Sequence, residues 1–396
     1  MQPIPFNRPL VLEAGYSYLR QAVAQGHLSG DGPFTRRCHA MLEQLLGVPR
    51  VLLTTSCTHA LEMAALLLDL RPGDEVIVPS FTFVSTANAF VLHGARPVFV
   101  DVRSDTLNLD ETRLERLITP RTRAIVPVHY AGVGCDLAAI LRIGERHGVA
   151  VIEDNAHGLF GRYAGQPLGT FGCLATLSFH ETKNFSCGEG GALLINDPRY
   201  AERAEVLREK GTDRNRFFRG EVDKYTWRDV GSSYLPSDAL AALLFAQLEE
   251  HQQIQTRRRA IWQRYADGLS DWAADVGARL PVVPPECEQA HHLFYLVMPS
   301  LEQRQALIAH LRARGVHAIF HYLPLHLSEM GQRFGGRAGD CPVTEAVSDR
   351  LVRLPLFFDL SETDQERVIA AIRAYSGRVH VNISDPLAPA RFRPAA

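Results

Sequence analysis

Short, strongly apolar runs alternate with longer stretches of helical apolar spacing between about residues 50 and 200. The runs are rich in valine, isoleucine and leucine, and most are apolar at nearly every position, which indicates strands buried on both faces. They are RVLLTT, EVIVPS, RPVFVDV, RAIVPVHY, AVIEDN, ATLSFH and GALLIN. Because helical segments separate them, the pattern predicts an α/β fold with a mostly parallel seven-stranded sheet between helices.

The pattern changes after the last of these runs. Residues 237–270 form one long helical stretch that we expect to lead out of the sheet domain. Strand HHLFYLVMP, helix SLEQRQALIAHLRARG, strand VHAIFHYLP and a helix in SETDQERVIAAIRAYS then predict a smaller C-terminal α/β domain. The expected units are an N-terminal arm and helix (1–30), a large domain (31–250), a small domain (251–380) and a disordered tail (381–396).

Composition narrows the class of protein. The 396 residues carry 42 basic and 44 acidic side chains, so no net field favours nucleic acid. The chain shows neither a signal-peptide pattern nor an apolar run of the roughly 20 residues that span a bilayer. Its seven cysteines are scattered and never spaced as CxxC, which indicates reduced thiols and a cytoplasmic protein without disulfides or a zinc site.

The segment LLTTSCTHALEMAA is a strand that turns directly into a helix. Such a junction presents free backbone N–H groups and the positive end of the helix dipole, which together bind phosphate. Cys57 and Thr58 would offer N–H groups, and Ser56 and Thr58 could add hydroxyls. The alternative is that Ser56 or Thr58 simply caps the helix.

The strand AVIEDNAHG ends in adjacent carboxylates. Asp154 follows a buried strand at its carboxyl end, where ligands bind in open α/β sheets. A carboxylate there could keep the ring nitrogen of a pyridinium cofactor protonated, although a helix cap or a metal ligand would use the same position. Glu153 should point to the opposite face if the strand alternates regularly.

A polar turn with one lysine lies in ATLSFHETKNFSCGEGGALLIN. A lysine that bonds covalently to an aldehyde cofactor needs a constrained turn and a lowered pKa. Lys183 is the only lysine between Asp154 and Lys210, and Ser178 precedes it at the end of a strand, where it could contact phosphate. Taken alone, a lysine in a loop is a solvated surface residue.

Aromatic residues near the end of a predicted strand give weaker evidence for a ligand site. In PSFTFVSTANAF, either Phe81 or Phe83 could lie flat against an aromatic ring, or both could belong to the core. We interpret Tyr225 and Trp227 as structural aromatics.

Two pairs of histidines could suggest a metal, but we expect packing or substrate contact instead. His291 and His292 are adjacent, and His321 and His326 are five residues apart. Neither pair has a familiar zinc spacing. A dinucleotide-dependent oxidoreductase remains a possible class for such a fold, although no GxGxxG follows the early strands.

Several long segments resemble the sugar aminotransferases named after DegT, DnrJ, EryC and StrS, which are fold-type I enzymes dependent on pyridoxal 5'-phosphate (PLP). The segments are GHLSGDGPFTRRCHAMLE, PSFTFVSTANAF, PVHYAGVGCD, SFHETKNFSCGEGGALL, FFRGEVDKYTWRDVGSSYLPSDALAALLFAQLE and FHYLPLH. The resemblance covers residues 3–377. Within the family, SFHETKN, VDKYTWRDVGSSYL and FHYLPLH are most similar to the members that make dTDP-4-amino-4,6-dideoxygalactose.

The resemblance implies a role for each matching residue. Lys183 would be the lysine that bonds to PLP and moves the proton, Asp154 would pair with the pyridine nitrogen, and Phe83 would stack on the ring. Three residues would hold the phosphate, namely Cys57, Thr58 and Ser178. His157 stands where the wider family usually has glutamine, and its contact with the ring hydroxyl is expected. Family dehydratases have histidine in place of the PLP lysine, so Lys183 argues against that reaction.

The resemblance also implies substrates and partners. A homodimer with shared active sites is expected, in which Ser233, where the family often has asparagine, reaches the phosphate of the neighbouring subunit. Residues facing the sugar nucleotide would be Ser29, His321, Tyr322 and His326. The substrates would be L-glutamate and a dTDP-linked 4-keto-6-deoxy sugar, for an amino sugar of cell-surface polysaccharide. Transfer to the 3-position, a UDP or GDP carrier, and a regulator without turnover are the alternatives.

Overall fold

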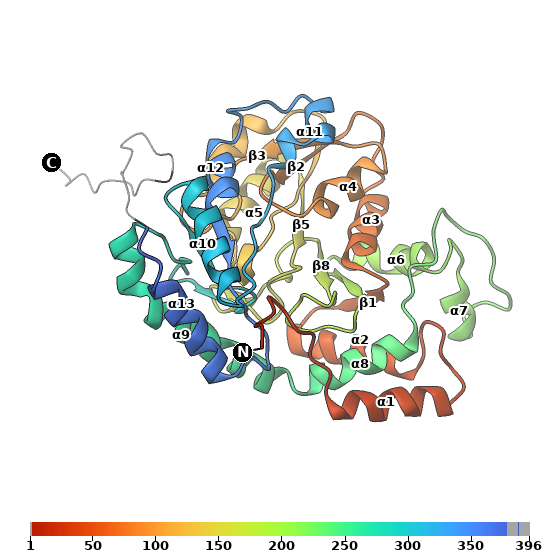
Figure 1. Cartoon of the computed structure of the whole chain (residues 1–396). Helices are drawn as coiled ribbons and strands as arrows, with labels where there is room; N and C mark the ends of the chain where they lie inside the picture. Colours follow the sequence, from red (N-terminus) through yellow and green to blue (C-terminus); the bar gives the residue numbers. More distant parts are fainter. Residues whose placement is uncertain (1, 378–386, 388–396) are drawn as a thin grey trace.

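The computed structural model describes residues 2–377 and Leu387, and a seven-stranded sheet lies at its centre (Figure 1). The strand order is β1-β9-β8-β5-β4-β2-β3. The strands are β1 (Arg50–Thr54), β2 (Glu75–Pro79), β3 (Arg96–Val100), β4 (Thr122–Ile125), β5 (Ala150–Asp154), β8 (Leu174–Ser178) and β9 (Gly191–Ile195). Strand β9 runs antiparallel to β1 and β8, and the other pairs are parallel. The predicted α/β fold and mostly parallel sheet are confirmed.

Helices cover both faces of this sheet because successive strand residues point to opposite sides. Leu52 faces one side and packs in a core with α3, α4 and α6, whereas Val51 and Leu53 face the core formed with α2 and α8. The first set is α3 (Cys57–Leu67), α4 (Ser85–Val91) and α6 (Ala201–Arg208), and the second is α2 (Pro33–Leu46) and α8 (Asp238–Glu249). Helix α5 (Leu137–His147) packs in a further core that includes Val151 of β5. Helix α1 (Glu13–Ala24) packs on α8.

A second hydrophobic core lies in the C-terminal part of the chain, where α9 and α13 lie side by side (Figure 1). Its elements are α9 (His251–Val276), β11 (Tyr295–Val297), α10 (Leu301–Ala313), β12 (Leu351–Arg353) and α13 (Glu362–Arg373). Strands β11 and β12 pair antiparallel. Ile4 is buried in the same core, so the N-terminal segment packs on these elements. We therefore propose that the small domain begins near residue 251.

The remaining elements are short. They are β6 (Arg162–Tyr163), β7 (Gln166–Pro167) and β10 (Cys287–Glu288), which form a small sheet, and α7 (Arg214–Phe218), α11 (Glu329–Arg333) and α12 (Pro342–Arg350). Helix α7 and its flanking loops project from the body of the molecule, on the right of Figure 1.

Two predictions about local structure are wrong. The helical stretch 237–270 is two helices, because the chain leaves helical geometry at Glu250 and passes from the sheet core to the second core. The segment VHAIFHYLP forms isolated bridges, including one between Ile319 and Arg353, because its residues line a cavity instead of extending a sheet. Tyr225 and Trp227, interpreted as structural aromatics, are exposed at 51% and 80%.

All seven cysteines have free thiols, as predicted. Among residues 2–377 and 387, no helix combines the length and apolar character needed to cross a bilayer. The tail predicted over 381–396 lies outside the described residues, apart from the buried Leu387.

Candidate active site

A cavity of about 590 Å³ lies where the strands β1, β5 and β8 end. These three strands run in one direction, so their carboxyl ends meet at one edge of the sheet, which is where α/β proteins bind ligands. The predicted residues that line the cavity are Ser56, Cys57, Thr58, Phe83, Asp154, His157, Ser178, Lys183, His321 and Tyr322. The fold thus places the Lys183 amine and the Asp154 carboxylate in one cavity.

The N-terminus of α3 forms one wall of this cavity. Ser56 is the N-cap, and its hydroxyl accepts a hydrogen bond of 3.1 Å from the N–H of His59. The Thr58 hydroxyl donates to the hydroxyl of Ser85 at 2.8 Å. Cys57 and Thr58 lie in the first helical turn, whose N–H groups have no partner within the helix. This wall therefore offers backbone donors and a helix dipole to an anion.

Asp154 is a buried carboxylate at the end of β5, with 4% of its surface exposed. The Thr86 hydroxyl donates to it at 2.7 Å and the Ala156 N–H at 3.2 Å. Burial raises the pKa of Asp154, while these two hydrogen bonds act to lower it. Both donors are neutral, so a cation placed in the cavity against this carboxylate would favour its ionised form.

Lys183 lies in the turn between β8 and β9, where its backbone N–H donates to the carbonyl of His180. Burial lowers the pKa of Lys183 to about 8, although the nearby Cys57 and Asp154 act to raise it. About a tenth of the amine is therefore uncharged at pH 7, far more than for an ordinary lysine. An uncharged amine is the nucleophilic form that attacks an aldehyde.

Three histidines line the deep part of the cavity. His157 stacks on His292 with ring centroids 4.2 Å apart, and the His321 ring lies 6.2 Å from His157. Burial lowers the pKa of all three rings well below the usual value. They are therefore neutral groups that orient ligands without adding charge to the cavity. His321 also contacts the hydroxyl of Tyr130 at 3.0 Å.

The lysine turn is tied to the small domain through Asn184. Its amide N–H donates to the carbonyl of Ala290 at 2.7 Å, and its amide oxygen contacts the His292 ring nitrogen Nδ1 at 2.9 Å. Neither Asn184 nor the Asp154 partner Thr86 was predicted from the sequence, whereas His292 was expected in packing or substrate contact. The adjacent histidines in HHLFYLV were a signal, but the residues that they face could not be known from the sequence.

Three predicted residues lie outside this cavity. Ser29 and Ser233 are exposed on loops before α2 and α8. The predicted contact of His326 with the sugar nucleotide is not supported within one chain, because its ring is fully buried away from the cavity. Its Nδ1 contacts the Ser80 hydroxyl at 2.6 Å and its Nε2 contacts Glu345 at 3.0 Å, which indicates a packing role.

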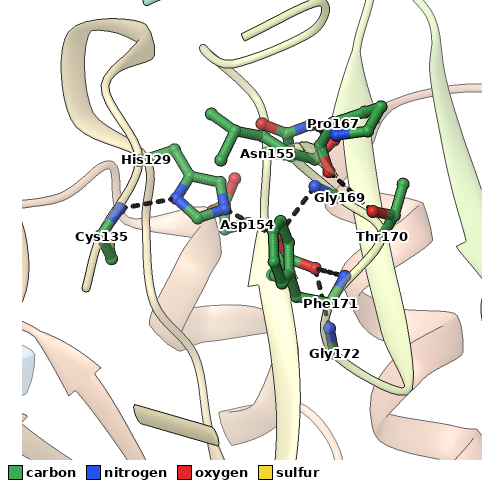
Figure 2. Close-up of polar contacts among 12 residues, drawn as sticks. His129, Cys135, Asp154, Asn155, Pro167, Gly169, Thr170, Phe171 and Gly172 are labelled. Atoms are coloured by element: carbon green, nitrogen blue, oxygen red, sulfur yellow. Dashed lines mark hydrogen bonds and ion pairs between the residues drawn. The ribbon is translucent and has the colours of Figure 1, made fainter. Parts of the chain in front are cut away.

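Glu153 points to the other face of the sheet, as the alternation predicts. Its buried carboxylate accepts hydrogen bonds of 2.7–2.8 Å from the N–H groups of Gly169, Phe171 and Gly172. His129 donates from Nε2 at 2.9 Å, because its Nδ1 accepts from the Cys135 N–H. Figure 2 shows His129 and the loop residues converging beside the strand. Glu153 thus anchors the loop between β7 and β8 to the strand that carries Asp154.

The donor set fits PLP. An amine with a lowered pKa, a buried acid without a cationic hydrogen-bond donor, and a helix N-terminus match the aldehyde, the ring nitrogen and the phosphate of this cofactor. Together with a mostly parallel sheet and a second hydrophobic core in the C-terminal part, these groups define a PLP-dependent enzyme of fold-type I.

Comparisons with known proteins agree with this class. The model of the DegT/DnrJ/EryC1/StrS aminotransferase family matches residues 13–373. The chain therefore belongs to this family of PLP-dependent sugar aminotransferases. The dinucleotide-dependent oxidoreductase considered above is thereby excluded.

Solved structures with the same fold include three that cover nearly the whole chain. Spr1654 from Streptococcus pneumoniae, assigned as a sugar aminotransferase and solved in a PLP form, has a TM-score of 0.87, 27% identity, and coverage of 94% of this chain and 98% of its own. The aminotransferase TlmJ from Streptoalloteichus hindustanus has a TM-score of 0.86, 34% identity and coverage of 94% and 98%. DesV from S. venezuelae has a TM-score of 0.86, 31% identity and coverage of 96% and 100%.

Substitution of the two adjacent carboxylates of β5 should have different effects, on stability for Glu153 and on activity for Asp154. Glu153→Gln replaces an acceptor with an N–H group that faces N–H donors, and we expect it to lower the free energy of unfolding by about 2–4 kcal/mol. Asp154→Asn should leave stability nearly unchanged and lower kcat by about 10²- to 10⁴-fold. Denaturant unfolding and steady-state kinetics on both variants measure the contrast, and equal stability losses would contradict it.

The lowered pKa of Lys183 predicts how cofactor capture depends on pH. The initial rate at which apoenzyme gains the visible absorption of bound PLP should rise about tenfold per pH unit below 8, because only the uncharged amine attacks, and level off above it. Stopped-flow absorbance between pH 6 and 10 measures this rate. A midpoint near 10.5, the value of an ordinary lysine, would show that burial does not tune the amine.

Proposed function

We propose that this enzyme transfers the amino group of L-glutamate to the 4-keto position of a dTDP-4-keto-6-deoxyhexose, giving dTDP-4-amino-4,6-dideoxygalactose. The observation that carries the proposal is the shared cavity of Lys183 and Asp154, with an amine whose pKa suits proton transfer near neutral pH. The choice of sugar is supported by SFHETKN, VDKYTWRDVGSSYL and FHYLPLH.

We further propose how the cavity residues hold the cofactor. The backbone N–H groups of Cys57 and Thr58, with the hydroxyls of Ser56 and Ser178, would bind the phosphate. The neutral ring of His157 would contact the ring hydroxyl. Phe83, which is 57% exposed at the cavity wall, would stack on the ring.

Proton movement would depend on two groups. When bound, PLP supplies an aldehyde for the amino group and an electron-poor ring that stabilises negative charge on the adjacent carbon. Asp154 would keep the ring nitrogen protonated, and that positive charge would in turn keep Asp154 ionised against its burial. The Lys183 Nζ would take the proton from the α-carbon of glutamate, and later deliver one to C4 of the sugar. His321 and Tyr322 would contact the sugar nucleotide.

We also propose a homodimer with shared active sites, working in the cytoplasm. The projecting segment around α7 carries exposed apolar side chains, with Phe218 at 66%, Trp227 at 80% and Val230 at 54%. Clustered exposed aromatics on one segment favour a protein interface. Such an interface would bring Ser233, and with it Ser29, to the site of the neighbouring subunit, although both lie outside the cavity of their own chain. Free thiols agree with a reducing compartment.

The substrate proposal predicts one product. Purified enzyme given L-glutamate and dTDP-4-keto-6-deoxyglucose should form a sugar with nitrogen on C4 in the galacto configuration, identified by NMR. Lys183→Ala should lose turnover by at least about 10³-fold and lack the visible absorption of lysine-bound cofactor. UDP- and GDP-linked 4-keto sugars, a 3-keto sugar, and enzyme without sugar are run in parallel. Preferred amination at C3 or of another carrier would replace the proposal, and no conversion of PLP by glutamate would favour a regulator.

The shared site predicts complementation between two inactive variants. Lys183→Ala removes the amine, and Ser233→Asp places a negative charge where the neighbour's phosphate is proposed to lie. In a coexpressed mixture, half of the dimers would be mixed and each would hold one intact site, so activity should recover to about a quarter of wild type. Steady-state rates of the mixture and of each parent measure this. A mixture no more active than its parents would contradict the shared site.

A further inference from the structure

Arg353 ends strand β12 and lines the same cavity as Lys183, although no part of the sequence analysis singled it out. One terminal nitrogen, Nη2, donates to the carbonyl of Phe320 at 3.1 Å. The guanidinium carbon lies 4.7 Å from the centre of the Phe6 ring. The Nε of Arg353 is buried without a hydrogen-bond partner in the described part of the chain.

Arg353 is partly buried, and two buried arginines have more partners than it does. Arg208 is 1% exposed, pairs with Asp31 at 2.5 Å and donates to the carbonyl of Leu53. Arg258, which also has no ion pair with a carboxylate in the described part of the chain, donates to two carbonyls, those of His291 and His292. Arg353 forms no ion pair with a carboxylate among residues 2–377 and 387, and burial lowers its pKa because its charge is desolvated. A partly buried cation without a counter-ion is poorly solvated, so an anion that enters the cavity would be favoured beside it.

We propose that Arg353 binds the carboxylate of the amino donor, which makes it a specificity-determining residue for α-amino acids at this site. The proposal rests on the proposed aminotransferase function. The cofactor phosphate is provided for by the N-terminus of α3, which leaves the guanidinium available for a second anion. A guanidinium presents two parallel N–H donors, the arrangement that matches a carboxylate.

Arg353 could bind the carboxylate of the amino donor or the diphosphate of a nucleotide sugar, and the chemistry of the two substrates favours the carboxylate. The amino nitrogen of the donor must react at the position of the Lys183 amine, and its carboxylate is attached to the carbon that bears this nitrogen. Arg353 is close enough to Lys183 for its charge to act on the pKa of that amine. In a nucleotide sugar, by contrast, the diphosphate lies across the sugar ring from C4. A cation inside the cavity near Lys183 therefore suits the carboxylate better than the diphosphate.

Phe6 and Phe320 hold the guanidinium in place. Phe6 belongs to the N-terminal segment, which is itself fixed where the N–H of Ile4 donates to the carbonyl of Gly315 at 2.7 Å. Stacking on an aromatic ring orients a guanidinium while leaving its in-plane N–H groups free to donate. Phe6 is therefore a positioning residue for Arg353.

The test separates the two half-reactions of the PLP-loaded enzyme. Arg353→Gln should raise the apparent KM for L-glutamate, followed as the spectral conversion of bound PLP, by about 10- to 100-fold. Arg353→Lys keeps the charge without the paired donors and should fall between Arg353→Gln and wild type. Enzyme preloaded as its pyridoxamine form should react with the keto sugar within about threefold of the wild-type rate in both variants. The matched control is Arg304→Gln, since Arg304 lies over Phe320 at 5.7 Å but outside the cavity, and it should change neither step.

Binding of glutarate, a dicarboxylate without an amine, provides a readout without turnover. Titration calorimetry should detect glutarate binding to PLP-loaded wild type and to Arg304→Gln, and at least about tenfold weaker binding to Arg353→Gln, with thermal melting to confirm folding. Equal affinity for Arg353→Gln, no binding to wild type, or a larger effect on the keto-sugar step would overturn the role of Arg353. If wild type does not react with glutamate, the proposed function fails instead, and the glutarate titration still decides whether Arg353 binds a carboxylate.

Discussion

The carboxylate of Glu153 accepts four hydrogen bonds in a place with no access to water, and the position of Asp154 depends on it. Three of the donors are backbone N–H groups of one loop, and the fourth is His129 from the end of the neighbouring strand segment. A buried carboxylate with this many donors cannot move without leaving several of them unpaired. Because adjacent strand residues point to opposite faces, fixing Glu153 on one face also fixes Asp154 on the other.

Asp154 shares its cavity with two basic side chains and three neutral histidines. Lys183 and Arg353 contribute positive charge, while burial keeps His157, His292 and His321 neutral. Five protonated groups in one enclosure would repel one another, so neutral histidines allow polar contacts without that cost. The remaining positive charge suits ligands that each carry an anion, which is true of the cofactor, an amino acid and a nucleotide sugar.

Sequence periodicity predicted the sheet, and it predicted that Glu153 and Asp154 point to opposite faces of that sheet. Both predictions depend on the local alternation of side chains. It did not predict the break at Glu250, since the residues on both sides favour helix and the break depends on which core each half packs against. Arg353 was missed, and the place of His292 in the cavity was not predicted, for a related reason. Both residues come from the C-terminal part of the chain, and only its packing against the sheet places them beside Lys183.

The roles proposed for Arg353 and Asp154 agree with how firmly each side chain is held. Asp154 is held by the sheet, whose strands are paired on both sides, so its position is set before any ligand arrives. Arg353 ends β12, a strand of a two-stranded sheet, and is held by Phe6 from the N-terminal segment and by the carbonyl of Phe320. Fewer contacts of this kind leave a side chain freer to adjust. Under these two proposals, a donor that must enter and leave in each turnover would be bound by the more adjustable side chain, and the cofactor by the more rigid one.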